Sequence, residues 1–145
     1  MKEERVKDME KEKTYTIQEI SQRYQLPHST LRYYEELGLL PKVEKTPSHQ
    51  RIYKEEHIRR LDGIVCFKRT GLPIAKIKEF YQYEQNLEEN IDNIILLVDC
   101  HEREIQNKIK ELEADLVHIQ KKVRYYHAIK ESYENGTGFP DWNQV

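Results

Sequence analysis

The sequence lacks the features that mark several large classes of protein. It contains no run of about 18 apolar residues and no apolar stretch near the N-terminus typical of a secretory signal, so we expect no membrane segment and a cytoplasmic location. Its 145 residues include two cysteines, Cys66 and Cys100, which are too few for a disulfide framework and form no Cys-x-x-Cys pair. Glycine and proline number five each. The composition predicts a mainly helical protein, with one small domain and a long extension.

Charge of either sign is not in large excess, since 24 Lys and Arg stand against 26 Asp and Glu. Residues 1–13 carry five groups of each sign and indicate a flexible charged arm. Residues 14–80 hold twelve basic and eight acidic groups, whereas residues 81–145 hold seven and thirteen. The basic segment is therefore the one expected to face a polyanion such as nucleic acid, although ordinary variation also accounts for an excess of this size.

Residues 16–38 predict two short helices joined by a tight turn. Thr16 with Glu19 three residues later has the pattern of a capping box, and the helix it opens ends before Pro27. A second helix is expected from about His28 to Leu37, with Gly38 as its stop. The side of this helix opposite its apolar stripe presents Ser29, Arg32, Tyr33 and Glu36. An exposed Arg–Tyr pair suits a phosphate backbone, but two surface helices of any small bundle show the same pattern.

The next segment predicts a small hairpin with a basic, polar tip, the shape called a wing. Residues 40–43 and 51–53 are extended in type and enclose the polar residues 45–50. Four side chains of this segment either reach along a sugar-phosphate strand or belong to a solvated loop: Lys42, Lys45, His49 and Arg51. Two further helices are expected at about 54–70, ended by Gly71, and at about 72–83.

From Ile91 onward, apolar residues recur with a period of 3.5. Ten of the eleven seam positions are apolar or aromatic, and Glu102 is the exception; the others are Ile91, Ile95, Val98, Ile105, Ile109, Leu112, Leu116, Ile119, Val123 and Tyr126. Such a stripe is typical of a coiled coil and needs a partner, which we expect to be a second copy of the chain. An intramolecular hairpin is the alternative, but no turn signal interrupts residues 91–130.

Together these residues resemble the MerR family of bacterial transcriptional regulators. The resemblance rests on Tyr15–Ile20, Thr30–Glu35, Leu37–Pro41, Arg51–Tyr53 and Gly71–Ile74. It implies a winged helix-turn-helix DNA-binding domain at residues 14–83, an antiparallel coiled-coil dimerisation helix with its linker at 84–134, and a short tail at 135–145.

The resemblance also implies a mechanism. A homodimer would bind a palindrome in the spacer of a promoter, then bend and untwist the double-stranded DNA so that RNA polymerase meets both promoter elements on one face. The residues expected at the DNA are Thr16, Ser29, Thr30, Arg32, Tyr33, Lys42 and Arg51. The chain departs from the family pattern at Gln25, where a glycine is usual near the turn, and at His49-Gln50, which replace the usual Gly-Tyr of the wing.

The signal to which such a regulator responds is less well defined by the residues. The cysteines of metal-sensing members are missing, and about eleven residues follow the long helix, so we expect neither a metal site nor another cofactor nor a large ligand domain. Cys66 resembles the single cysteine of the aldehyde- and electrophile-responsive branch, which would imply a stress response, with Asp62, Arg69 and Arg59 as expected neighbours; the alternative is an inert core residue.

Three other interpretations remain. Five aromatic residues either line a ligand pocket or serve packing: Tyr81, Tyr83, Tyr125, Tyr126 and Trp142. A thiol enzyme with Cys66 as nucleophile is disfavoured, because no histidine stands at a spacing that predicts its base. A coiled-coil adaptor without a DNA role explains residues 91–130 but gives the basic segment no purpose.

Overall fold

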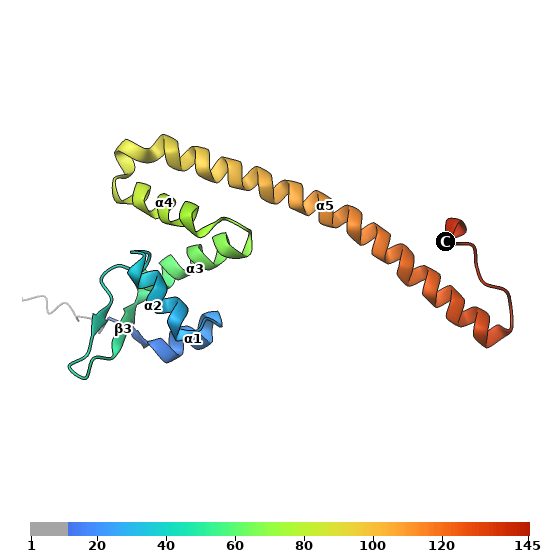
Figure 1. Ribbon diagram of the computed structural model, residues 1–145, viewed down its shortest axis with the longest axis horizontal. Helices are drawn as coiled ribbons and strands as arrows, with labels where there is room; N and C mark the ends of the chain where they lie inside the picture. Colours follow the sequence, from blue (N-terminus) through green and yellow to red (C-terminus); the bar gives the residue numbers. More distant parts are fainter. Residues whose placement is uncertain (1–11) are drawn as a thin grey trace, which may run out of the picture. The chain divides into compact units, whose positions relative to one another are not determined.

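The computed structural model describes residues 12–145, so that most of the expected charged arm at residues 1–13 lies outside the described residues. The described chain is mainly α-helical, as predicted, with one small sheet (Figure 1). Its elements are β1 (Thr14–Thr16), α1 (Ile17–Tyr24), α2 (His28–Glu36), β2 (Glu44–Lys45), β3 (Arg51–Lys54), α3 (Glu55–Arg69), α4 (Ile74–Gln85), α5 (Leu87–Asn135) and the 3-10 turn η1 (Trp142–Gln144). The chain divides into two compact units, Met1–Ile95 and Leu96–Val145.

The first two helices begin and end where the sequence predicts. The side chain of Thr16 accepts a hydrogen bond from the backbone N–H of Glu19 at 3.1 Å, which caps α1. α1 ends at Gln25, whose φ of 53° is left-handed, and the chain then turns into α2. α2 ends before Gly38, whose φ of 78° favours glycine because a side chain at this angle would be strained.

One hydrophobic core joins α1, α2, the wing and α3. Ile20, Leu31, Tyr53, Leu61 and Ile64 are all fully buried, and each comes from a different element except the last two. Burial of a large apolar side chain stabilises a fold by about 1.5–3 kcal/mol, so this core is sufficient to hold the short helices at fixed positions. The outward face of α2 is therefore presented by a rigid base.

The sheet differs from the predicted hairpin in two ways. The first wing strand is β2 at Glu44–Lys45 and not residues 40–43, because Leu39 and Leu40 are buried in the core and Lys42 turns the chain with a φ of 59°. A third strand, β1, was not predicted. It pairs antiparallel with β3, so that the strand order is β1-β3-β2 and Tyr15 lies opposite Tyr53.

α3 and α4 pack their aromatic side chains together. In α4, Tyr81 is buried while Phe80 is half-buried, and both contact Phe67 of α3, with ring centroids 6.5 and 5.0 Å apart. Gly63 is required here, because a Cβ atom at this position would lie 2.4 Å from the hydroxyl of Tyr81. That hydroxyl donates a hydrogen bond to the carbonyl of Arg60 at 3.3 Å.

α5 is one continuous helix of 49 residues, and it is not folded into a hairpin (Figure 1). It ends at Asn135, next to Gly136 with a φ of 66°, where the sequence predicts the break. The tail then folds back: the ring of Trp142 lies 5.1 Å from that of Tyr125 and 4.6 Å from the ammonium group of Lys121. The tail therefore packs on its own helix.

Candidate nucleic-acid interface

The outward face of α2 carries most of the polar side chains predicted to meet DNA. Ser29 and Arg32 are exposed, and Tyr33 is 46% exposed, whereas Leu31 and Tyr34 of the same helix point into the core. Thr30 is half-buried at the edge of this face. A guanidinium group and a hydroxyl on a flat ring, held side by side on a rigid helix, can donate hydrogen bonds to phosphate oxygens and to base edges.

Thr16 and Lys42 lie at exposed positions on other elements. Thr16 is exposed, and its hydroxyl oxygen already accepts the capping hydrogen bond from the backbone N–H of Glu19 at the start of α1. Lys42 is exposed at the turn that leads from the core into the wing, in the left-handed conformation. Non-glycine residues occupy this conformation only where the surroundings impose it.

Arg51 has a partner that the sequence analysis did not assign. Its Nε atom donates to the two carboxylate oxygens of Glu35 at 2.7 and 3.1 Å, which joins β3 of the wing to α2. The two side chains are 24% and 16% exposed. Among the described residues, none accepts a hydrogen bond from the Nη atoms of Arg51, so the ion pair orients the guanidinium group without using all of its donors.

The electrostatics under the wing follow from the same carboxylate. Burial, with the negative charge of Glu35 beside it, raises the pKa of Tyr53 to about 12, so this tyrosine is neutral at any physiological pH. Sequence reasoning missed Glu35 because its partner lies 16 residues away, on β3. It also missed His57, which is buried at the base of the wing.

Cys66 is exposed, and it does not occupy the core position that was the alternative prediction. It lines an open cavity of about 440 Å³ between the end of α1 and α3, together with Arg23, Tyr24, Gln25, Asp62, Val65 and Arg69. Of its three expected neighbours, Asp62 and Arg69 line this cavity, while Arg59 lines another one.

Asp62 in this cavity already has a hydrogen-bond partner. The hydroxyl of Tyr24 donates to the Asp62 carboxylate at 2.7 Å, and burial together with this bond raises the pKa of Tyr24. The side chains of Arg23 and Arg69 line the same cavity as the thiol.

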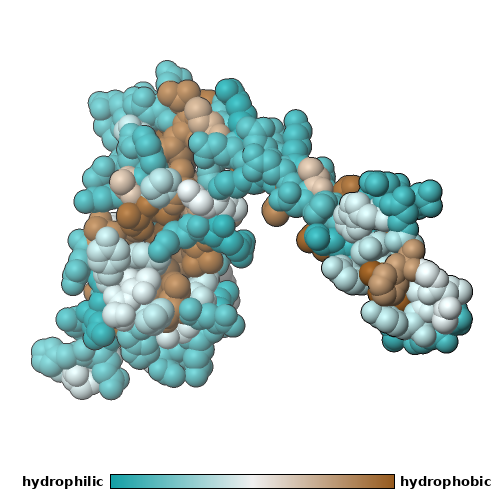
Figure 2. All heavy atoms as spheres, turned by 45° about the vertical axis from the view of Figure 1, so that its right-hand side comes forward, coloured by the Kyte–Doolittle hydropathy of each residue, from teal (hydrophilic) through white to brown (hydrophobic). Residues whose placement is uncertain are grey.

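The long helix leaves its apolar seam in contact with solvent. Leu112 is 67% exposed, and the other apolar residues of the seam are between 36% and 63% exposed, apart from the half-buried Ile105. Figure 2 shows the apolar side chains of this part of the chain as brown patches on its surface. Tyr125 and Trp142 of the predicted aromatic set contact each other beside the seam, whereas Tyr81 packs in the α3–α4 cluster.

Within residues 12–145, no group of three His, Cys, Asp or Glu side chains is placed to hold a metal ion. In the same described part of the chain, the helices are all too short or too polar to cross a membrane.

Comparison with known proteins identifies the family. Residues 15–84 match the family model of MerR HTH family regulatory proteins. The chain is 28% identical over 127 residues to the HTH-type transcriptional regulator YfmP of Bacillus subtilis, and the aligned region covers 84% of this chain and 89% of that protein. It is also 32% identical over 83 residues to the ZntR homolog of Haemophilus influenzae, covering 57% and 62%.

Solved structures agree with this result. A MerR family transcriptional regulator from Bacillus thuringiensis is 32% identical, with a TM-score of 0.66 over 77% of this chain and 98% of that one. HiNmlR, a MerR family regulator lacking the sensor domain and solved bound to promoter DNA, has a TM-score of 0.76 at 24% identity and covers 86% and 92%, which shows the shared fold. The chain therefore belongs to the MerR family, and it is a transcriptional regulator and not an enzyme.

Proposed function

We propose that this regulator binds promoter DNA through the outward face of α2 and the wing. The observation that carries the proposal is the exposed pair Arg32 and Tyr33 on a helix whose other face is fully buried. The solved complex of HiNmlR with promoter DNA, which shares this fold, supports the same use of the domain. An adaptor without a DNA role leaves this exposed Arg–Tyr face unexplained.

Each contact residue has a role set by its chemistry. Arg32 and Tyr33 donate to phosphates and bases of one half-site, with Ser29 and Thr30 beside them at the start of the helix. Lys42 and Arg51 bind the sugar-phosphate strand next to the wing, and Glu35 holds the guanidinium group of Arg51 in place. Thr16 lies where the start of α1 offers backbone N–H groups to a phosphate.

The regulator acts as a homodimer held by the seam of α5. Nine exposed apolar side chains on one stripe cannot be covered by the tail, which packs to one side of them. The charges along α5 favour antiparallel pairing: residues 87–104 hold six acidic groups and one basic, whereas residues 117–130 hold four basic groups and no acidic one. An antiparallel partner places the acidic end of each helix beside the basic end of the other.

Two copies joined in this way bind the two halves of a palindrome on one duplex. Regulation then consists of bending and untwisting the promoter so that RNA polymerase recognises both of its elements, as the family resemblance implies. Such a deformation costs several kcal/mol, on the order of 1–6 for a site of 20–30 base pairs. The phosphate contacts of two protomers supply the compensating free energy.

The signal is an electrophile such as an aldehyde, to which the thiol of Cys66 adds: sulfur bonds to the carbonyl carbon, the C=O double bond becomes a single bond, and the thiol proton ends on the oxygen, so no group leaves. The support is the exposure of this thiol in an open cavity with Arg23 and Arg69, at the junction of α1 and α3. A bulky adduct there presses on the end of α1 and so changes the support of α2. Regulation that does not involve Cys66 is the alternative.

Fluorescence anisotropy with the promoter DNA upstream of the gene tests the proposal at two salt concentrations. We expect binding that weakens steeply with salt, and a loss of roughly tenfold in affinity in R32A, together with a salt slope smaller by about one. K110A, which removes an exposed cation from α5, is the matched control and should bind as the wild type does. Absent or salt-independent binding would favour the adaptor.

A further inference from the structure

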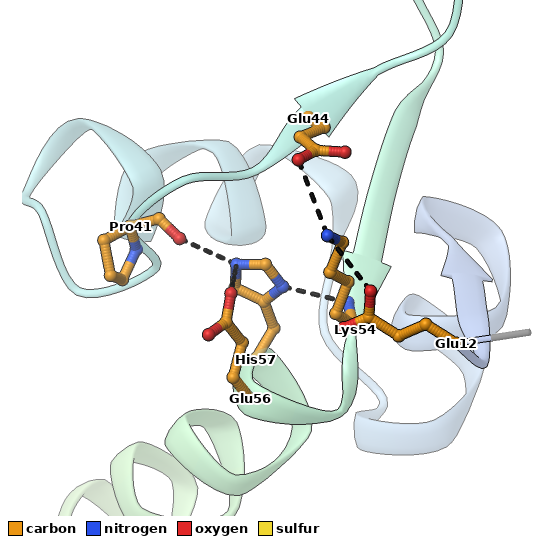
Figure 3. Close-up of polar contacts among 6 residues, drawn as sticks. All are labelled: Glu12, Pro41, Glu44, Lys54, Glu56 and His57. Carbon is orange, nitrogen blue, oxygen red and sulfur yellow. Dashed lines mark hydrogen bonds and ion pairs between the residues drawn. The ribbon is translucent and has the colours of Figure 1, made fainter. Parts of the chain in front are cut away.

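His57 is a buried histidine whose two ring nitrogens are both hydrogen-bonded to the backbone at the base of the wing. Only 1% of the residue is exposed. Its Nδ1 atom accepts a hydrogen bond from the N–H of Lys54 at 2.9 Å, and its Nε2 atom donates to the carbonyl of Pro41 at 2.7 Å (Figure 3). This pattern assigns the proton to Nε2 and requires a neutral ring, because Nδ1 is an acceptor.

The two partners of His57 are the two ends of the wing. Pro41 immediately precedes Lys42, the exposed cation in the left-handed conformation, and Lys54 is the last residue of β3. His57 is also the third residue of α3, so the bond to Lys54 closes the start of that helix in the manner of a capping box. One imidazole ring therefore ties the beginning and the end of the hairpin to α3.

We propose that His57 is a positioning residue that holds the wing, and Lys42 in particular, at the distance from α2 that DNA binding requires. The inference rests on the proposed DNA-binding function and extends it to a residue that does not touch DNA. Without the bond to Pro41, the strained turn at Lys42 loses one of the contacts that impose it.

The charged groups around the ring are either exposed to solvent or already paired. Glu56 lies 4.0 Å from Nε2 but is 55% exposed, so solvent screens its attraction for a positive ring. The ammonium group of Lys54 is bound by Glu12 and Glu44, at 3.3 and 3.5 Å (Figure 3). The edge-on neighbour Tyr53 is neutral, as its pKa of about 12 requires.

Protonation of Nδ1 would point a second N–H group at the N–H of Lys54 and break the bond to the end of the wing. The neutral ring that carries its proton on Nε2 is therefore the form that holds both ends of the wing.

The experiment measures affinity for promoter DNA for the wild type, H57Q, H57L and the control H49N, with circular dichroism of each variant. Gln at the third helix position retains an acceptor for the N–H of Lys54. We expect H57Q to bind within about twofold of the wild type, whereas H57L, which has neither bond, should bind roughly tenfold more weakly. H49N changes an exposed histidine of the wing and should bind within about twofold of the wild type.

A double-mutant cycle with K42A completes the test. If His57 acts through Lys42, the loss caused by H57L becomes smaller in the K42A background. A folded H57L that keeps the wild-type affinity would overturn the positioning role and leave the DNA-binding function intact. If H57L does not fold, H57F, which keeps a flat ring but makes neither bond, takes its place. A wild type that binds no promoter DNA would instead overturn the DNA-binding function.

Discussion

The helices α1 to α4 and the helix α5 differ in how far their apolar side chains are buried. In the first set, residues such as Ile20, Leu31 and Leu61 are completely buried within the chain itself. Along α5, Leu112 and Leu116 are 67% and 54% exposed although they lie on one continuous stripe. The winged helix-turn-helix therefore buries its apolar side chains within one chain. On α5, the apolar side chains remain exposed, and their burial against a partner would stabilise association.

The largest expected effect is a loss of stability when the buried core of the winged helix-turn-helix is disrupted. L61A removes a fully buried side chain and should lower the free energy of unfolding by about 2–5 kcal/mol. L96A removes the same atoms from a leucine that is 65% exposed on α5, and it should change stability by about 0.5 kcal/mol or less. Urea denaturation followed by circular dichroism measures both variants. Equal stability of the two would contradict the assignment of the core.

The second effect concerns dimerisation through the exposed seam of α5. L116D places a charge on the seam, and because each Leu burial is worth about 1.5–3 kcal/mol and occurs twice in a symmetric dimer, the dimer dissociation constant should rise at least about 100-fold. V117D is the control, since Val117 is 64% exposed on the same helix but lies off the seam. Size-exclusion chromatography over a range of concentrations compares them. Dissociation caused equally by both variants would mean that another face of α5 forms the interface.

The third effect is a smaller change in DNA affinity, and its direction decides between two roles of Glu35. E35Q removes a negative charge near DNA, and simple electrostatics predicts tighter binding; because Glu35 orients Arg51, we expect binding about fivefold weaker instead. E36Q removes the charge of an exposed neighbour on the same helix and should strengthen binding slightly. Anisotropy titrations distinguish the two signs, and tighter binding by E35Q would show that the ion pair does not position Arg51.

The smallest effect on DNA affinity is expected for the thiol. C66S should bind the promoter within about twofold of the wild type, since serine replaces an exposed side chain. It should nevertheless fail to respond to aldehydes in a promoter-reporter assay, in which C100S serves as the control. A normal aldehyde response of C66S would exclude covalent addition to Cys66 as the mechanism.

Features of the fold that depend on local interactions were predictable from the sequence. The start of α1 at Thr16, the end of α2 at Gly38 and the long heptad stripe each follow from residues that are near one another in the chain. The outward face of α2 was predictable for the same reason, since helical periodicity places Arg32 and Tyr33 opposite the buried Leu31.

Features that depend on distant partners were not predictable. β1 has three residues and forms only because β3, far along the chain, offers an edge to pair with. The ion pair of Arg51 with Glu35 and the bonds of His57 to Pro41 and Lys54 require the folded wing before they exist. The displaced first wing strand has the same origin, because burial of Leu39 and Leu40 outweighs the extended preference of residues 40–43.

Sedimentation equilibrium of the protein with and without a promoter duplex tests the central claim most directly, because it weighs the species that forms. The account predicts twice the chain mass of 17.6 kDa for the free protein at micromolar concentration, and two chains bound to each duplex at saturation. A stable monomer that binds one chain to each duplex, or a dimer that binds none, would contradict it.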